Sequence, residues 1–465
     1  MEKQERSSFS SRVGFVLAAA GSAVGLGNLW RFPYLAARYG GGIFLLVYLI
    51  LVVTFGFSLM ITEFAIGRKT KLSCIGAYGA LDKRFSFLGW IAAFVPLIIT
   101  PYYCVIGGWV MKYLWTFISG GALEAADNGG FFSRFISFDA GSLPATMLNF
   151  SGPTPWFVLF VLITGLVVIF GVQKGIENAS RLMMPVLAVL IVVIALYSLT
   201  IPGALAGLKY YLMPDFSQFS ASTVLGACGQ MFYSMSLAMG ITITYGSYMP
   251  KENLLEHSVT QIEIFDTLFA FFAGLMIIPS VIAFNGGDPS QVNSGPSLMF
   301  ISLPMVFDSM KFGTVIGAVF FLLVLFAALT SSIALMETLA SVIMDKFKLK
   351  RIPATLIIIA VCLVVGMLSC LGYGPWESVT IIGMQFLDFF DFLTNSVMMP
   401  IAAITICLLV SRVIGVKAVE EEVMHGEAAF RRKKIFNFMI NYLCPVFAAI
   451  ILLSSVANAF GLISM

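Results

Sequence analysis

The sequence contains few charged residues. Asp, Glu, Lys and Arg make up 11% of its 465 residues, whereas soluble domains carry about 25%, so a water-soluble protein of this size is excluded. It has only two histidines, and its seven cysteines are scattered without a CxxC pair or a Cys/His cluster. Neither a zinc site nor a disulfide framework is expected, and a net charge of +3 gives no indication of a nucleic-acid partner.

Hydrophobic residues make up 59% of the chain and gather in membrane-length runs. They predict an all-α polytopic membrane protein in the lipid bilayer. A cleaved signal peptide is not expected, because the first apolar run leads into further spans. Eleven transmembrane helices are predicted near residues 12–37, 41–68, 86–119, 154–171, 177–200, 221–249, 257–284, 312–344, 352–371, 377–411 and 434–459.

The connections between spans carry the positive charge. Lys and Arg number 27, and 21 of them fall in the segments on the same side as the N-terminus. This bias predicts a cell-membrane protein with a cytoplasmic N-terminus and, after an odd number of spans, an external C-terminus. The 285–310 segment is expected to be a re-entrant cap, and the charged run 420–434 a solvated loop rather than a binding site.

Two spans contain helix-breaking or polar residues at mid-membrane. The first is interrupted over Gly21–Arg31 and the sixth over Gln230–Gly240. Unwound backbone in a membrane must line a cavity, where free carbonyls attract a cation and free amides an anion. Close helix packing through small residues would explain either stretch alone. Interruptions at matching positions in two five-helix halves favour the central site of a transporter.

At these residues the chain resembles the neurotransmitter:sodium symporter family, particularly its bacterial amino-acid transporters with eleven spans. The resemblance rests on Gly21–Pro33, Gln230–Gly240 and Leu329–Ala334 and covers nearly the whole chain. It implies one transporter domain, 1–465, with a LeuT-type fold: an inverted five-plus-five helix repeat with helices 1 and 6 broken. Repeat one would cover about 12–200, repeat two about 221–411, and an additional helix about 434–459.

The resemblance implies two sodium sites. The first would use the Ala23 carbonyl, the Asn28 side-chain oxygen, Ser234 and Asp266. The second would use the carbonyls of Gly21, Val24 and Ala327 with the hydroxyls of Thr330 and Ser331. Sodium prefers such hard oxygen ligands. A lone Ser or Thr in a membrane helix more often bonds a carbonyl of its own helix.

The same resemblance implies an amino-acid substrate. The amides of Leu26 and Gly27, with the Tyr103 hydroxyl, would bind its carboxylate, and carbonyls of Ala23 and of Tyr233 or Ser234 its ammonium. Gly25 stands where amine carriers of the family have aspartate. The remaining expected pocket residues are Ile99, Phe232, Ser236, Met239 and Leu335. No charge there suits a charged side chain, and Met239 favours an aromatic one, although Ala238 departs from the Gly-Met-Gly of aromatic-selective members.

Charged residues inside spans are expected to form gates. Arg31 would face Asp391 with Gln230 nearby on the outer side, and Arg6 would pair with Asp345 beside Tyr248 on the inner side. Asp388 either shares the outer gate or faces water. Glu63 is expected to accept hydrogen bonds from the unwound backbone.

Chloride is not expected to be needed. Animal members of the family generally hold chloride through a serine whose position here is Ala270, while Asp266 stands where the family usually has asparagine. A carboxylate at that point would supply the missing negative charge. Whether Asp266 also takes up a proton when sodium leaves stays open.

Together these features predict a sodium-coupled symporter that imports a hydrophobic, aromatic amino acid by alternating access. A proton-coupled or exchange carrier on the same fold is the main alternative. Both histidines, His257 and His425, fall at polar connections and no motif has nucleophile spacing, so an enzyme is not expected. A channel would need a continuous polar lining, and a receptor a larger cytoplasmic region.

Overall fold

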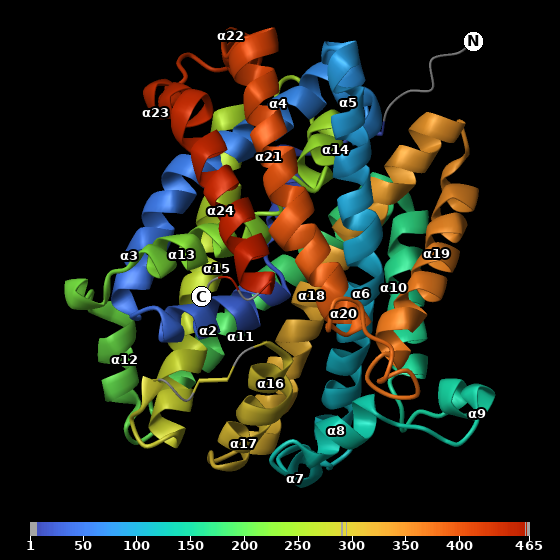
Figure 1. The fold of residues 1–465 in the computed structure, drawn as a ribbon, viewed down its shortest axis with the longest axis vertical. Helices are drawn as coiled ribbons and strands as arrows, with labels where there is room; N and C mark the ends of the chain where they lie inside the picture. Colours follow the sequence, from blue (N-terminus) through green and yellow to red (C-terminus); the bar gives the residue numbers. More distant parts are fainter. Residues whose placement is uncertain (1–6, 290–291, 294, 461, 463–465) are drawn as a thin grey trace.

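The computed structural model describes residues 7–289, 292–293, 295–460 and 462. Across these residues the chain is helical, and the extended backbone forms only two isolated bridges, between Gly41 and Pro214 and between Ile381 and Met384. The long helices run along one common direction, and short helices cover both ends of the molecule (Figure 1). This confirms the expected all-α class.

The first half of the chain supplies five expected spans and their connections. In order it forms α1 (Arg12–Ala23), η1 (Gly27–Arg31), α2 (Phe32–Arg38), α3 (Gly42–Leu51), η2 (Val52–Gly56), α4 (Phe57–Thr70), α5 (Cys74–Leu81), η3 (Lys83–Phe85), α6 (Ser86–Ile118), α7 (Ala122–Ala125), α8 (Gly130–Ile136), α9 (Leu143–Leu148), α10 (Thr154–Ile169), η4 (Val172–Glu177), α11 (Asn178–Ser198), α12 (Ala204–Leu212) and η5 (Phe216–Gln218). Spans one, two and five are each composites of α-helix and a wider helical turn.

The second half repeats this organisation and adds one helix. In order it forms α13 (Ala221–Ser234), α14 (Ile241–Tyr248), α15 (Leu255–Phe284), α16 (Gly295–Ser297), η7 (Leu298–Ser302), α17 (Leu303–Asp308), α18 (Gly313–Phe347), α19 (Arg351–Leu371), α20 (Phe386–Asp391), η8 (Phe392–Met398), α21 (Met399–Leu408), η9 (Leu409–Ile414), α22 (Lys417–Val423), α23 (Lys433–Phe438), η10 (Met439–Leu443) and α24 (Cys444–Ala459).

Eight continuous helical segments in the described chain are long and apolar enough to cross a membrane. A ninth span is the pair formed by α1 and η1–α2, which is bent by 50° at its break. The shorter apolar helix α10 and the interrupted pair α13–α14 occupy the two other predicted positions. Each of the eleven predicted segments therefore has helical counterparts, and their number as membrane spans stays a prediction.

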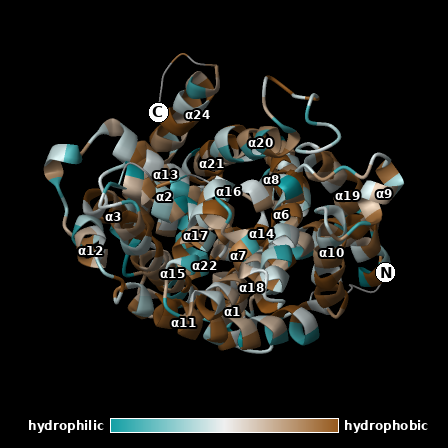
Figure 2. Ribbon diagram, turned by 90° about the horizontal axis from the view of Figure 1, so that it is seen from below, coloured by the Kyte–Doolittle hydropathy of each residue, from teal (hydrophilic) through white to brown (hydrophobic). Residues whose placement is uncertain are grey.

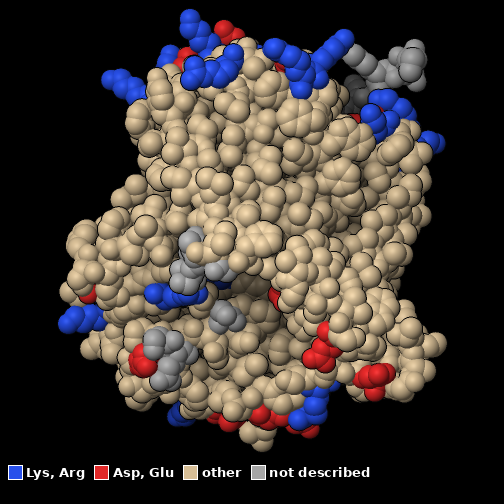
Figure 3. Space-filling view, viewed as in Figure 1, with Lys and Arg blue, Asp and Glu red and all other residues tan. Residues whose placement is uncertain are grey.

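The two ends of the molecule differ in charge. Hydrophobic residues predominate along the long helices (Figure 2). Lys and Arg gather at the end that carries α22 and α23, and acidic residues are prominent toward the other end (Figure 3). We call the end with α22 and α23 the basic end.

Small residues bring helices to backbone contact around the centre. A Cβ on Gly67 of α4 would lie 2.0 Å from the Ile243 carbonyl oxygen of α14, so these helices approach as closely as their backbones allow. A Cβ on Gly108 of α6 would lie 2.6 Å from the Phe157 nitrogen of α10. The long helix α18 packs against both α6 and α1. Through these contacts α18 reaches the interrupted part of span one.

Most of the charged run 420–434 is exposed, as predicted for a solvated loop, but its helical start holds a buried acid. Glu422 of α22 pairs with Arg68 of α4 at 2.7 Å, and both side chains are buried. Arg68 also donates to the Asn253 carbonyl at 2.8 Å. A buried guanidinium needs a counter-charge and full hydrogen bonding, and Glu422 supplies the charge.

The 285–310 segment forms a helical cap at the end opposite the basic end. It contains α16, η7 and α17, and α17 packs against α18 (Figure 1). The Tyr113 hydroxyl of α6 donates to the Phe300 carbonyl at 2.7 Å. This contact ties the cap to α6.

Candidate functional site

The first interruption lies between α1 and η1. Val24, just after α1, is extended with φ −71° and ψ 101°, and a helical turn restarts at Gly27. A Cβ on Gly25 would lie 2.6 Å from Ser331 Oγ and 2.9 Å from the Tyr103 hydroxyl oxygen. Glycine is therefore the residue that lets this backbone approach α6 and α18.

The second interruption lies between α13 and α14. Ser236 and Ala238 adopt left-handed backbone with φ of 53° and 61°, which costs energy for residues other than glycine. Ala238 N–H donates to Glu63 Oε1 at 3.0 Å, and the Thr242 hydroxyl donates to the same carboxylate. This confirms the prediction that Glu63 accepts hydrogen bonds from the unwound backbone.

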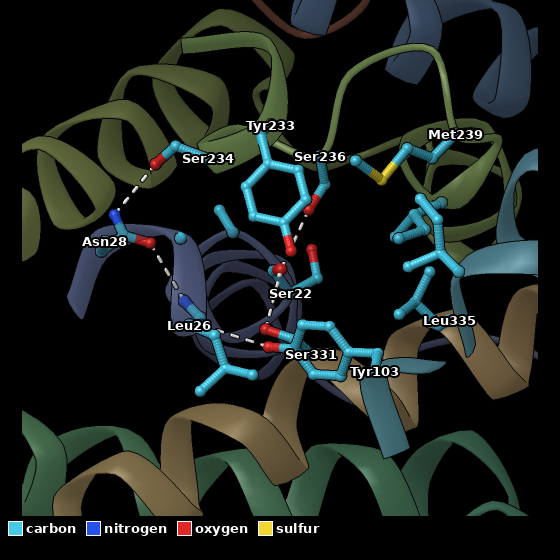
Figure 4. Close-up of a pocket in the computed structure, with 15 residues that line it drawn as sticks. Ser22, Leu26, Asn28, Tyr103, Tyr233, Ser234, Ser236, Met239, Ser331 and Leu335 are labelled. Carbon is cyan, nitrogen blue, oxygen red and sulfur yellow. Dashed lines mark hydrogen bonds between the residues drawn. The ribbon is translucent and has the colours of Figure 1, made fainter. Parts of the chain in front are cut away.

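The two interruptions border a narrow cavity of about 30 Å³ (Figure 4). The predicted residues that line it are Ala23, Gly25, Leu26, Gly27, Ile99, Tyr103, Tyr233, Ser234, Ser236, Met239, Ser331 and Leu335. Its lining also includes Ser22, Asn28 and Ile241. Met239 and Leu335 lie on one side of the cavity, opposite Asn28 (Figure 4).

Phe232 does not line this cavity, contrary to the prediction. It packs edge-on against Phe55 with ring centroids 5.1 Å apart and contributes to a separate outer cavity. Consecutive residues of an α-helix point about 100° apart. Tyr233 and Ser234, the next two residues of α13, line the central cavity, so Phe232 points toward the other side of the helix.

Three residues of the expected first sodium site meet in one buried cluster. Asp266 accepts hydrogen bonds from Asn28 Nδ2 at 2.8 Å, from the Ser234 hydroxyl at 2.8 Å and from the Tyr48 hydroxyl at 3.3 Å. Asn28 Oδ1 accepts from Gly25 N–H at 3.1 Å, so ligation through that oxygen would require the amide to turn over. The donor set of carboxylate, hydroxyl and carbonyl oxygens suits sodium.

The residues of the expected second sodium site also converge. The Ser331 hydroxyl lies 3.4 Å from the Gly21 carbonyl oxygen and 3.3 Å from that of Val24. The Thr330 hydroxyl donates to the Ala327 carbonyl at 3.0 Å, and a Cβ on Gly21 would lie 3.2 Å from Thr330 Cβ. Three of the five expected oxygens, those of Ser331, Gly21 and Val24, thus lie together, whereas the Thr330 hydroxyl bonds a carbonyl of its own helix.

The expected outer gate is not closed by direct contact. No ion pair within 4.0 Å joins Arg31 to Asp391, both of which lie in the described chain. Asp391 instead accepts from the Tyr102 hydroxyl at 3.1 Å and from Asn395 at 2.5 Å. The Arg31 guanidinium lies 5.4 Å from the centroid of the Tyr233 ring. Arg31 and Asn395 line the outer cavity of about 290 Å³.

Gln230 contacts the interrupted backbone of span one rather than Arg31 or Asp391. Its Nε2 donates to the Gly27 carbonyl at 3.0 Å, and its Oε1 is buried without a partner in the described chain. Asp388 accepts from the Tyr373 hydroxyl at 3.4 Å, which favours neither of the two roles considered for it.

On the side of the basic end, the path to the cavity is closed by packed side chains. The Phe9 ring stacks edge-on against Tyr245 and Tyr248. The Tyr248 hydroxyl donates to Glu337 at 2.7 Å, and Glu337 pairs with Arg351 at 2.5 Å. Arg6, the expected partner of Asp345, lies outside the described residues; Asp345 accepts from the Ser73 N–H at 2.7 Å.

Several residues of this site were not predicted from the sequence. Glu337 lies inside an apolar span, and intramembrane charge is by itself a functional signal, so it could have been found. Tyr48 could not, because only the fold brings it to Asp266. Ser22 and Ile241 could not be assigned to the cavity either, because their positions depend on the exact path of the two unwound segments.

With this geometry, the chain can be compared with known proteins. The sequence profile of the sodium:neurotransmitter symporter family matches residues 6–122 and 131–462. The chain belongs to this family. It is 34% identical over the full length of both chains to an uncharacterized sodium-dependent transporter, YhdH, of Bacillus subtilis (strain 168). It is 35% identical to another from Methanocaldococcus jannaschii, over 87% of this chain and 81% of the relative.

A solved structure of similar fold supports the architecture. The crystal structure of MhsT in complex with L-phenylalanine superposes with a TM-score of 0.86 at 36% identity, covering 97% of this chain and 100% of that one. The fold is therefore the predicted LeuT type. Membership of a sodium symporter family makes the chain a multi-pass membrane transporter and gives no sign of enzymatic catalysis.

Proposed function

We propose that this symporter imports a hydrophobic amino acid, aromatic by preference, together with sodium. The observation that carries the proposal is the cavity between two interrupted helices, polar on one side and apolar on the other. The Leu26 N–H at the start of η1 donates to the Tyr103 hydroxyl at 3.2 Å, and both residues line the cavity. MhsT, which has a similar fold, was crystallised in complex with L-phenylalanine.

The polar side of the cavity suits a free amino acid rather than an amine. The start of a helical segment favours an anion through its partial positive charge, so the amides of Leu26 and Gly27 would bind the carboxylate. Carbonyls of Ala23 and of Tyr233 or Ser234 would receive the ammonium. Gly25 has no side chain, so the space beside it stays free for the substrate carboxylate. An aspartate at this position would fill that space.

The apolar side would hold the substrate's side chain. Ile99, Met239 and Leu335 line it together with the Tyr233 ring. Methionine adapts its shape to a bulky partner, and the side carries no charge to pair with a basic or acidic substrate.

Two sodium ions would drive accumulation. Each charge entering along the membrane potential releases about 2.3 kcal/mol per 100 mV. Two ions release about 4.6 kcal/mol, which supports roughly thousandfold accumulation before their own gradient is counted. Support for two sites comes from the two separate oxygen clusters, around Asp266 and around Ser331.

The basic end would face the cytoplasm, following the rule that Lys and Arg are retained inside. In that orientation the large outer cavity opens to the exterior, while the packing around Phe9 and Glu337 closes the interior. The conformation is then outward-facing. Closing would bring Arg31 to Asp391, and opening inward would separate Arg6 from Asp345.

Transport would not need chloride. The Asp266 carboxylate already supplies a negative charge to the cluster and accepts hydrogen bonds from three neighbours. Ala270, one turn further along α15, offers no hydroxyl to an anion. A carrier coupled to protons on the same fold is the competing proposal, and it would not depend on the hydroxyls of α18.

The sodium proposal predicts that Thr330→Ala/Ser331→Ala weakens apparent sodium affinity by about tenfold or more per hydroxyl, since bonds to charged groups contribute about 1.5–3 kcal/mol. Sodium-dependent binding of labelled phenylalanine to purified protein measures this. Ser332→Ala is the matched control, because that hydroxyl contacts Thr164, 3.1 Å away, instead of α1. Equal loss in the control, or none in the double variant, would contradict the proposal.

The gate proposal predicts that Asp391→Ala slows uptake at least tenfold while equilibrium substrate binding changes less than threefold. The pair would close over a substrate that is already bound, so it acts on turnover. Uptake in proteoliposomes and binding in detergent are compared on the same preparation. Glu377→Ala, an exposed acid on the same side of the molecule, serves as control. Normal turnover in Asp391→Ala refutes the gate.

The chloride proposal predicts unchanged uptake when gluconate replaces chloride. Asp266→Asn/Ala270→Ser removes the fixed charge and adds a hydroxyl, so this variant should be active only with chloride. Loss of wild-type uptake in gluconate would overturn the idea. Asp266→Asn alone separates the effect of the charge from that of the hydroxyl.

A further inference from the structure

A third cavity lies at the basic end, apart from the transport site. It measures about 450 Å³ and lies where three segments meet: Arg12 at the start of α1, residues 254–260 at the start of α15, and residues 426–432 between α22 and α23. It shares no lining residue with the central cavity. Lys and Arg crowd the surface of this end (Figure 3).

The two carboxylates of this cavity are engaged in holding the loop against α15. Glu256 accepts from the backbone N–H groups of Arg431 at 2.8 Å and Arg432 at 3.0 Å. Glu427 in turn accepts from the backbone N–H groups of Glu256 at 2.7 Å and His257 at 3.4 Å. The two segments thus bind each other reciprocally, and both carboxylates accept backbone hydrogen bonds in that contact.

Arg432 is likewise fixed by the protein. Its guanidinium pairs with Glu263 at 2.9 Å, donates to the Thr260 hydroxyl at 2.5 Å and stacks 3.4 Å from the centroid of the Phe57 ring. Its side chain is 18% exposed. This arginine stabilises the cavity wall through these contacts, so its guanidinium is not available to a ligand.

Two other arginines at the cavity have no acidic partner among the residues that the structure describes. Arg12 donates to the neutral Gln261 at 3.2 Å. The Arg431 guanidinium makes no hydrogen bond or ion pair within the part of the chain that the structure describes. Both line the cavity. They leave two positive charges facing a space that can admit an anion.

An apolar stripe begins beside the cavity and runs along α15 toward the middle of the molecule. Ile264 and Leu268 follow Thr260 and Gln261 on the same face, at helical spacing. They are 51% and 49% exposed. A soluble anion would not contact this apolar stripe, whereas the acyl chains of a bilayer lipid would cover it.

We propose that this cavity binds the headgroup of an anionic phospholipid from the leaflet at the basic end. Arg12 and Arg431 hold its phosphate, and its acyl chains lie along Ile264 and Leu268. The charge complementarity and the adjoining apolar face together select a lipid. A free phosphate shares the headgroup chemistry and is tested separately.

The test uses the full-length protein in a neutral detergent with dioleoyl phosphatidylglycerol as probe, and native mass spectrometry to measure bound lipid. Each arginine near a membrane surface contributes about a fivefold gain in affinity for an anionic lipid. Arg431→Gln should therefore weaken binding about fivefold, and Arg12→Gln/Arg431→Gln about 25-fold. Arg431→Gln removes no side-chain hydrogen bond within the described chain, so folding should be preserved.

The control is Arg412→Gln/Lys417→Gln, which removes the same charge at the same end outside the cavity and should change affinity less than twofold. Equal weakening in both double variants would mean general attraction to a basic surface and would overturn the site. The proposal would also be overturned if phosphatidylcholine bound with the same affinity as phosphatidylglycerol. Displacement of the lipid by millimolar glycerol phosphate or inorganic phosphate would reassign the cavity to a soluble anion.

Discussion

Two helices that stop and restart inside the bundle leave backbone amides and carbonyls without partners within their own helix. In a membrane interior each such group costs several kcal/mol unless something satisfies it. The surrounding side chains meet this requirement one by one. Glu63 accepts a hydrogen bond from the Ala238 amide, and the Tyr103 hydroxyl accepts one from the Leu26 amide. The Gln230 side chain donates to the Gly27 carbonyl. The remaining carbonyls are those that the proposed ions and substrate would use.

The same constraint explains which residues are small. Gly25 allows the first break to touch Ser331 and Tyr103, and Gly27 brings backbone against the Tyr233 ring, where a Cβ would lie 2.5 Å from a ring carbon. Close approach lets α1 and α18 share one set of oxygens around Ser331. A movement of α1 away from α18 would separate that set, so ion binding and helix position are physically linked.

The helices and their interruptions could be predicted from the sequence, because both depend on local residue patterns. Apolar runs placed the spans, and the glycines and polar residues at matching positions located both breaks. The resemblance supplied the ligand sets, part of which lie together around Asp266 and around Ser331. Side-chain direction was harder: Phe232 was assigned to the pocket, although one helical step turns it toward Phe55.

Contacts between distant segments could not be predicted. The run 420–434 looks solvated by composition, yet Arg68 of α4 buries a guanidinium that only Glu422 neutralises at close range. Glu337 carried a usable signal, a lone charge in an apolar span, but its pairing with Arg351 follows from the fold. Local pattern finds the elements, and tertiary partners decide which charges are buried.

The central claim is that sodium, and not another ion, completes the site and drives the substrate through it. Uptake of radiolabelled phenylalanine into proteoliposomes tests this most directly, with an inward sodium gradient in one arm and potassium with an imposed proton gradient in the other. The account predicts accumulation above equilibrium with sodium and none without it. Equal accumulation in sodium-free buffer under the proton gradient would contradict it.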